Sequence, residues 1–245
     1  MTTAPILEVA DVKKSFAGVA ALSGISFTLP RNAITSIIGP NGSGKTSLLN
    51  IITGFYTADS GSVRLNGKEL IGLPSHRIAA QGVGRTFQHI RLFKELTALE
   101  NVLVGAERRG HKNARQRALA MLERLGLANW AGQRADSLPY GHQRRLEIAR
   151  SLAAEPQLLI LDEPAAGMNP SEKQELNDML RAIQDGELSI LLVEHDMDLV
   201  MDVSDHIAAI NFGKVIAQGT PDQVRSHPDV IEAYLGRDHE QALAN

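Results

Sequence analysis

The stretch Gly39-Pro-Asn-Gly-Ser-Gly-Lys-Thr46 decides how this chain folds. It fits the pattern G-x-x-x-x-G-K-[ST] of a phosphate-binding loop at every fixed position, from Gly39 through Gly44, Lys45 and Thr46. Residues 34–38 before it are apolar and β-branched, which predicts a buried strand, and the residues after it carry apolar side chains at helical spacing. An ordinary glycine turn is the alternative, and the flanking strand and helix argue against it.

A loop of this kind holds phosphate because its glycines let the backbone N–H groups turn inward and because the next helix presents the positive end of its dipole. Lys45 is placed for the β- and γ-phosphates, and the Thr46 hydroxyl is placed to ligate Mg²⁺. The sequence therefore predicts a nucleoside-triphosphate site. The residues expected to contact the nucleotide are Gly39, Pro40, Asn41, Gly42, Ser43, Gly44, Lys45, Thr46 and Ser47.

Length and composition leave room for such a site and do not favour nucleic acid as a partner. The chain has 245 residues and a formal net charge of −3, so nothing points to a polyanionic ligand. It has no cysteine, which excludes disulfides and thiolate metal sites. We expect a soluble chain, because no apolar run is as long as a membrane span and charged residues stand where a signal peptide would be apolar. A membrane role is then expected to come through a partner.

The order of the predicted elements indicates an α/β fold. Short apolar segments separated by turn residues predict strands at residues 6–12, 25–29, 34–38 and 62–65. The character changes to helical from residue 97 to about 154. Beyond that block, predicted strands alternate with predicted helices, which is typical of a parallel sheet flanked by helices. In chain order these four segments are residues 158–161, 171–183, 190–193 and 197–203.

Two carboxylates, Asp162 and Glu163, follow the predicted strand 158–161 directly. They stand at its C-terminal tip, the edge where α/β sheets bind ligands. Asp162 fits a residue that holds Mg²⁺ and its water shell, and Glu163 is then placed to polarise a water for attack on the γ-phosphate. An acidic pair that only caps the next turn is the alternative, and the phosphate loop makes it the weaker one.

With these motifs in order, residues 6 to about 236 resemble the nucleotide-binding subunits of ABC transporters. The resemblance implies ATP and Mg²⁺ as cofactors, adenine stacking by Phe16, and contact of Gln88 with Mg²⁺ and the attacking water. His195 is similar to the family's switch histidine, which contacts the γ-phosphate, and residues 165–169 occupy the family's D-loop. Core packing of Phe16 and a structural role for His195 remain as alternatives. The implied catalytic set is Lys45, Gln88, Glu163 and His195, and the implied metal set is Thr46, Gln88 and Asp162.

Residues 138–142, Leu-Pro-Tyr-Gly-His, resemble the family's signature motif but depart from its usual Leu-Ser-Gly-Gly-Gln. In the family, this motif completes the site of a second subunit. The serine hydroxyl that bonds the γ-phosphate is absent, because Pro139 replaces it. Gly141 and the free N–H groups of the following helix can still face an anion. We expect a weaker composite site formed by Pro139, Tyr140, Gly141 and His142.

The resemblance implies a P-loop NTPase core with an N-terminal antiparallel β subdomain and an inserted α-helical subdomain. The whole chain, residues 1–245, is expected to be a single nucleotide-binding domain. Its β-rich and RecA-like core is expected at about 1–88 and 155–220, the helical subdomain at about 89–154, and a C-terminal helical tail at about 221–245.

Three stretches, residues 84–93, 165–170 and 228–236, look like those of ATP-binding subunits of branched-chain amino-acid importers, a branch whose members also serve urea and short amides. The resemblance implies an ATPase on the cytoplasmic side of the cell membrane. Its implied partners are membrane permease subunits, a second ATP-binding subunit, identical or different, and indirectly a solute-binding protein. Residues 88–93 are expected to line the groove for a permease helix, with local core packing as the alternative. A lipopolysaccharide-export ATPase and a soluble ABC ATPase of the iron–sulfur assembly type remain as alternative functions.

Overall fold

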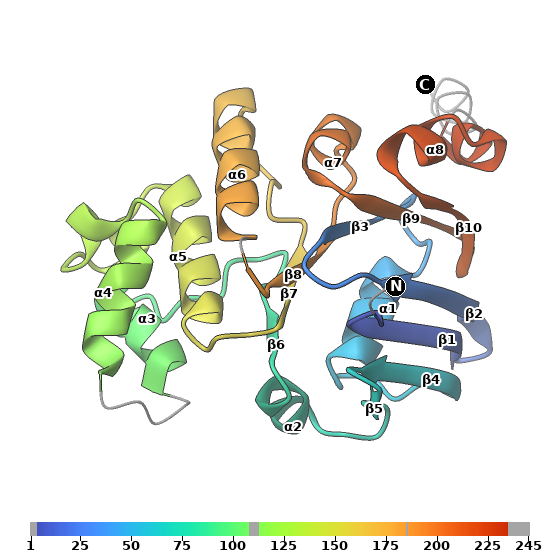
Figure 1. Cartoon of the computed structure of the whole chain (residues 1–245), viewed down its shortest axis with the longest axis horizontal. Helices are drawn as coiled ribbons and strands as arrows, with labels where there is room; N and C mark the ends of the chain where they lie inside the picture. The colour runs from blue at the N-terminus through green and yellow to red at the C-terminus, as the bar shows by residue number, and fades with distance from the viewer. Residues whose placement is uncertain (1–3, 108–112, 185, 235–245) are drawn as a thin grey trace.

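Two β-sheets and a separate group of helices make up residues 4–107, 113–184 and 186–234, the part of the chain that this computed structural model describes (Figure 1). The smaller sheet has four strands in the order β2-β1-β4-β5, and every neighbouring pair is antiparallel. This confirms the antiparallel N-terminal subdomain. Its strands are β1 (Leu7–Phe16), β2 (Val19–Leu29), β4 (Ser60–Leu65) and β5 (Lys68–Glu69).

The larger sheet has six strands in the order β10-β9-β3-β8-β7-β6. It is parallel except for the hairpin of β9 and β10 at one edge. The three central strands, β3, β8 and β7, are buried at every residue, because helices or the second sheet cover both faces. The strands are β3 (Ile34–Ile38), β6 (Val83–Arg85), β7 (Leu158–Asp162), β8 (Ser189–Val193), β9 (His206–Asn211) and β10 (Lys214–Gly219).

Helix α1 (Lys45–Ile52) lies between the two sheets and joins their cores (Figure 1). Its apolar side chains are at most 1% exposed and belong to the same buried cluster as residues of β1, β2 and β4 on one side and of β3, β7 and β8 on the other. The phosphate loop between β3 and α1 is therefore held by both sheets. Burial of four such side chains contributes roughly 1.5–3 kcal/mol each. They are Leu48, Leu49, Ile51 and Ile52.

The helices that follow β6 and precede β7 in the chain lie on the side of the large sheet away from the small sheet (Figure 1). They are α3 (Ala98–Glu107), α4 (Ala114–Arg124), the short 3-10 turns Ala128–Trp130 and Ala135–Ser137, and α5 (Tyr140–Leu152). They share one buried cluster with α6 (Pro170–Ile183) and with the face of β7 and β8 that carries Leu159, Leu161 and Leu192. The remaining helices are α2 (Ser75–Ala80), α7 (Met197–Val203) and α8 (Pro221–Arg225).

After β10 the chain continues with α8 and with helical residues 228–234. Residues 235–245 of the expected helical tail lie outside the described residues. Within the described ranges, no helix combines the length and the apolar character needed to cross a bilayer.

Candidate active site

The phosphate loop is built on backbone positions that only glycine fills. Gly39 has φ 155° and Gly44 has φ 108°. A Cβ on Gly39 would lie 2.1 Å from the carbonyl oxygen of Ile210, and one on Gly44 would lie 2.7 Å from that of Ala21. The loop is thus seated against β9 and β2, strands of two different sheets, and its shape is set before any ligand binds.

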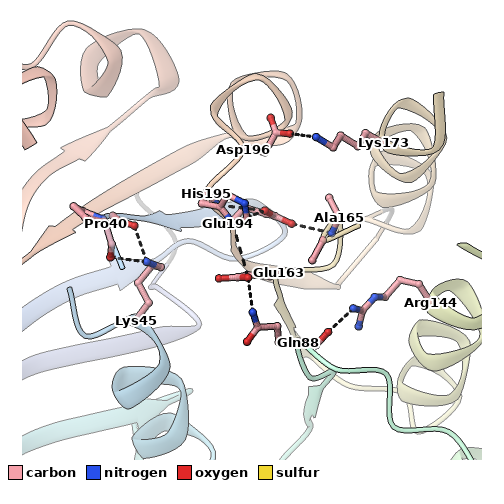
Figure 2. A network of polar contacts seen from close by, with 12 residues as sticks. Pro40, Lys45, Gln88, Arg144, Glu163, Ala165, Lys173, Glu194, His195 and Asp196 are labelled. Atoms are coloured by element: carbon pink, nitrogen blue, oxygen red, sulfur yellow. Dashed lines mark hydrogen bonds and ion pairs between the residues drawn. The ribbon is translucent and has the colours of Figure 1, made fainter. Parts of the chain in front are cut away.

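Lys45, the first residue of α1, folds its side chain back over the loop. Its Nζ donates hydrogen bonds to the carbonyl oxygens of Gly39 at 2.6 Å and Pro40 at 2.9 Å (Figure 2). The residue is only 7% exposed. The ammonium group is therefore held at the loop, where a phosphate would need a positive charge.

A cavity of about 640 Å³ brings most of the predicted nucleotide residues together. It joins the phosphate loop to three side chains that come from separate elements: Gln88 after β6, Glu163 after β7 and His195 after β8. Ser43 is buried beneath the loop and does not line the cavity. The lining residues are Ala21, Gly39, Pro40, Asn41, Gly42, Gly44, Lys45, Thr46, Ser47, Gln88, Glu163, His195 and Tyr234. Ala21 and Tyr234 carry no sequence signal that could have placed them there.

Glu163 occupies the left-handed backbone region, with φ 46°. Its amide donates to the carbonyl of Val193 at 2.9 Å, and its Oε2 accepts a hydrogen bond from Nε2 of Gln88 at 2.8 Å (Figure 2). The same Oε2 lies 3.9 Å from Nδ1 of His195. The side chains expected to act on the γ-phosphate therefore form one contiguous group.

Asp162, the last residue of β7, forms a buried ion pair that the sequence analysis did not include. Its Oδ2 accepts from Nη2 of Arg85 at 3.0 Å, and the two side chains are 9% and 7% exposed. Arg85 also donates to Asn50 at 2.9 Å and Thr53 at 2.7 Å. Burial lowers the pKa of Arg85 below its usual value, and Asp162 acts in the opposite direction.

The donor set of the predicted metal site fits magnesium. Asp162, Thr46 and Gln88 line a second cavity of about 320 Å³. A carboxylate, a hydroxyl and an amide oxygen are hard oxygen ligands of the kind that Mg²⁺ takes. Because Nε2 of Gln88 donates to Glu163, the oxygen of the same amide is the atom that can ligate a cation.

Glu194 is a buried carboxylate that links the turn after β7 to the turn after β8. The sequence did not predict a role for it. It is 1% exposed, and its oxygens accept from the amides of Ala165 at 2.9 Å and His195 at 3.1 Å (Figure 2). Burial raises the pKa of Glu194, while the two amide hydrogen bonds act to lower it. Its place immediately before His195 is the one signal that could have drawn attention to it.

The signature residues lie at the N-terminus of α5 and are not among the described residues that line either cavity. Pro139 is the N-cap, with φ −54° and ψ 151° and no capping hydrogen bond from its side chain. Tyr140 donates to the carbonyl of Ala166 at 3.1 Å, so the signature contacts the D-loop of its own chain. His142 packs on Trp130 at 4.8 Å between ring centroids, and burial lowers the pKa of this histidine.

Phe16 is the last residue of β1 and is 40% exposed. Its ring meets Tyr56 edge-on at 5.2 Å, and Nζ of Lys14 lies 5.5 Å from its centroid. This exposure does not fit the core-packing alternative. Among the described residues Phe16 does not line the loop cavity, so adenine stacking stays a prediction.

A larger groove of about 730 Å³ lies beside the site and includes part of the segment 87–93. Phe93 is 49% exposed there, whereas Leu92 packs partly against the core. Guanidinium groups stack on its aromatic rings: Arg91 lies 4.1 Å from the centroid of Phe87, and Arg150 lies 5.5 Å from that of Phe93. The segment is thus divided between the surface and the core, and its surface part is apolar with positive charge above it.

Arg144 of α5, another residue missed from the sequence, connects this segment to the signature helix. It is fully buried and donates to the carbonyl oxygens of Phe87 at 2.7 Å and Gln88 at 2.6 Å (Figure 2). The backbone that carries Gln88 is therefore bonded to the helix that begins with the signature.

A phosphate loop, an acidic strand end and a histidine facing one cavity define the nucleotide-binding domain of a P-loop ATPase. Comparison with known proteins agrees with this class and narrows it. The family model for ABC transporters matches residues 22–166, and the model for branched-chain amino acid ATP-binding cassette transporters matches residues 214–240. The chain belongs to the ABC transporter family, and it is an ATP-binding cassette of that family.

Curated relatives and solved structures cover nearly the whole chain. The chain is 46% identical to the high-affinity branched-chain amino acid transport ATP-binding protein BraF of Pseudomonas aeruginosa and 45% identical to LivG of Escherichia coli, in both cases over 95% of this chain and 98% of the relative. It is 32% identical to the lipopolysaccharide export system ATP-binding protein LptB of Haemophilus influenzae, over 94% and 97%. The crystal structure of an ABC transporter ATP-binding cassette in its ADP conformation superposes with a TM-score of 0.87 at 32% identity, covering 96% of this chain and all of that one.

Proposed function

We propose that this chain is the ATP-hydrolysing subunit of an importer for branched-chain amino acids or a related small solute. The arrangement that carries the proposal is the hydrogen bond from Gln88 to Glu163 beside His195, in the cavity that also holds the phosphate loop. The named activities of the relatives at 45–46% identity support the solute class, and so does the family match at residues 214–240. The lipopolysaccharide-export alternative has the weaker support of a 32% identical relative.

In the proposed reaction, ATP places its phosphates on the loop from Gly39 to Ser47. Lys45 and the loop amides neutralise the charge on the β- and γ-phosphates, so the terminal phosphorus is open to attack. Glu163 accepts a proton from the attacking water, and Gln88 holds the Glu163 carboxylate in place. His195 donates a hydrogen bond to the γ-phosphate as negative charge moves to the leaving oxygen.

We also propose Mg²⁺ as the metal, held by Thr46, Gln88 and Asp162. Held by these residues, the cation would supply positive charge that offsets the negative charge of the phosphates. The residues assigned to it supply only oxygen atoms and share one cavity, which supports magnesium over a softer metal.

Two of these subunits are proposed to close on ATP. Pro139, Tyr140, Gly141 and His142 lie outside the cavity of their own chain, so they meet nucleotide only if a second subunit supplies it. The N-terminus of α5 then faces the γ-phosphate with free N–H groups, without the usual serine hydroxyl. The second subunit is an identical copy or a related ATP-binding chain.

The groove of about 730 Å³ is the proposed docking site for a helix of a membrane permease subunit. Its rings supply apolar contact area, and Arg91 and Arg150 favour an acidic residue on the incoming helix. We further propose that the chain acts on the cytoplasmic side of the membrane. A solute-binding protein would act on this subunit only through the permease.

The Glu163→Gln variant tests the ATPase part of the proposal. The change removes the base and preserves its size, so ATP hydrolysis is expected to stop while ATP binding continues. Size-exclusion chromatography with ATP should then show a stable dimer for the variant and a transient one for the wild type. Hydrolysis by the variant at a near wild-type rate would overturn the assignment of Glu163.

Uptake assays test the solute class. The subunit is reconstituted in vesicles with its permease subunits and solute-binding protein, and radiolabelled leucine, isoleucine and valine are compared with urea and a short amide. Uptake of the three amino acids, abolished by Glu163→Gln, is expected. No uptake of any of these solutes, or copurification with lipopolysaccharide-export proteins, would support the rival functions instead.

A further inference from the structure

Glu194 stands out because its charge is buried without a cation to balance it. The residue is 1% exposed at the end of β8, and its carboxylate accepts hydrogen bonds from the main-chain amides of Ala165 and His195. In the described part of the chain no lysine or arginine pairs with it, and the nearest ring nitrogen, Nδ1 of His195, is 3.9 Å away. A carboxylate in such a place is costly, so the two amides it holds are the features to explain.

Those amides belong to the two turns that carry the reacting side chains. Ala165 lies two residues after Glu163, and His195 directly follows Glu194 itself. The end of β8 therefore holds the Glu163 turn at two points, through the carbonyl of Val193 to the Glu163 amide and through Oε1 of Glu194 to the Ala165 amide. Glu163 needs such restraint because its backbone is in the left-handed region.

We propose that Glu194 is a positioning residue for ATP hydrolysis, one carboxylate that fixes the Glu163 turn and the His195 backbone relative to each other. This inference rests on the proposed ATPase function. The two turns lie on neighbouring parallel strands, β7 and β8, whose register pairs Asp162 with Val193. Glu194 extends that pairing beyond the sheet, where the ladder of backbone hydrogen bonds has ended, and so sets the 3.9 Å separation between Oε2 of Glu163 and Nδ1 of His195.

If Glu194 positions these groups, its loss lowers kcat and leaves the affinity for ATP nearly unchanged. Glu194 does not contact the phosphate loop, so its loss leaves the grip of Lys45 and Thr46 on ATP intact. The base and the histidine, in contrast, become free to move relative to the γ-phosphate, and misplacement of reacting groups by about 1 Å lowers a rate by roughly a hundredfold.

The test compares Glu194→Gln, Glu194→Asp and Ser204→Ala in the full chain. Glutamine has the shape of the native side chain, but its –NH₂ group faces one of the two amide donors, so one hydrogen bond is lost. We expect kcat to fall roughly tenfold to a hundredfold with KM for ATP changed less than about twofold. Aspartate retains the charge but is too short to reach both amides, so it should restore little activity. Ser204→Ala removes a buried side-chain hydrogen bond to Ser36 elsewhere in the core, and it is expected to lower Tm without changing kcat.

Amide hydrogen exchange supplies a readout that does not depend on activity. Exchange at Ala165 and His195 should accelerate in Glu194→Gln and remain as in the wild type in Ser204→Ala. Wild-type kcat in Glu194→Gln, or unchanged exchange at both amides, would overturn the proposal. If the wild-type protein itself did not hydrolyse ATP, the proposed function would fail, and the exchange data would still show whether Glu194 holds the two turns.

Discussion

The guanidinium of Arg144 and the carboxylate of Glu147 form an ion pair one helical turn apart on α5, at 2.8 Å, with both side chains fully buried. Both partners also bind the segment that carries Gln88. Arg144 donates to the carbonyls of Phe87 and Gln88, and Glu147 accepts from the amide of Arg91 at 2.9 Å. The signature helix is therefore hydrogen-bonded to this segment through both members of the ion pair.

Removal of both charges of this pair should lower the ATPase rate while most of the stability is kept. Arg144→Met leaves the Glu147 carboxylate buried without its cation, and breaking a buried pair in this way costs about 3–5 kcal/mol. The double variant Arg144→Met/Glu147→Leu removes both charges and should recover most of the lost stability. Its ATPase is expected to stay low, because the backbone around Gln88 has lost its attachment to α5. Denaturant unfolding and ATPase rates check both statements, and wild-type activity in the double variant would contradict the second.

The groove beside the site should connect the ATPase to the membrane. Arg91→Glu reverses a charge over the Phe87 ring, and Phe93→Ala shortens an exposed ring at the rim. Each is expected to reduce uptake in vesicles by roughly tenfold, since interface residues of these types often cost more than 1 kcal/mol when altered. The ATPase rate of the isolated subunit should change far less. Equal loss of both activities would mean that these side chains serve the local core.

Pro139 offers a test of how the signature works. Pro139→Ser, in the Glu163→Gln background, should supply a hydroxyl for the γ-phosphate of the opposite subunit. A hydrogen bond to a charged group contributes about 1.5–3 kcal/mol where it is well formed, so even half of that would lower the ATP concentration for half-maximal dimer several-fold. The control is Pro139→Ala, which frees the backbone without adding a hydroxyl.

The N-cap position of residue 139 provides a rival outcome for this experiment. Serine is a favoured N-cap, and its hydroxyl can bond the amides of the helix that it caps. A higher Tm with an unchanged ATP requirement would therefore show that the hydroxyl caps α5 and does not reach the nucleotide.

Variants of the Arg85–Asp162 pair can distinguish the role of Asp162 in metal binding from its role in stability. Asp162→Asn removes a predicted metal ligand and leaves the Arg85 guanidinium without its anion, so both the Mg²⁺ dependence and the free energy of unfolding should suffer. Arg85→Lys weakens the same pair and keeps the carboxylate. The Mg²⁺ concentration for half-maximal ATPase should rise about tenfold or more in the first variant and little in the second, while both lose stability. An equal shift in both would mean that Asp162 acts through Arg85 alone.

Local pattern predicted the features that depend on short stretches of chain. The strand at 34–38 and the helix at 197–203 have the predicted ends, and α6 begins one residue before the predicted 171, after an Asn169–Glu172 capping box. Apolar runs and capping residues are adjacent in the sequence, so periodicity is enough to find them. The strands β6, β9 and β10 lie outside the predictions. β6 has only three residues and β10 is a partly exposed edge strand, whereas β9 is a buried strand between β3 and β10.

The polar residues that support the site could be recognised only once the fold was known. Arg85, Arg144 and Glu194 lie far in sequence from their partners, by 77 residues for Arg85 to Asp162, 56 for Arg144 to Gln88 and 29 for Glu194 to Ala165. No residue-type pattern connects such positions, because the contact exists only once parallel strands and the inserted helices are placed. Glu163 was found because it follows a predicted strand at the ligand-binding edge of the sheet, whereas Gln88 and His195 were found through the resemblance to the family's motifs.

The backbone of Glu163 has a consequence for selection experiments. A non-glycine residue in the left-handed region pays roughly 1–2 kcal/mol in local strain, and Glu163 at φ 46° is such a residue. Glycine at this position would remove the strain together with the carboxylate. A library of variants screened for heat resistance alone should therefore enrich Glu163→Gly, and the survivors would be sturdier proteins that no longer turn over ATP. Selection for growth on the imported solute should restore glutamate and accept the lower melting temperature.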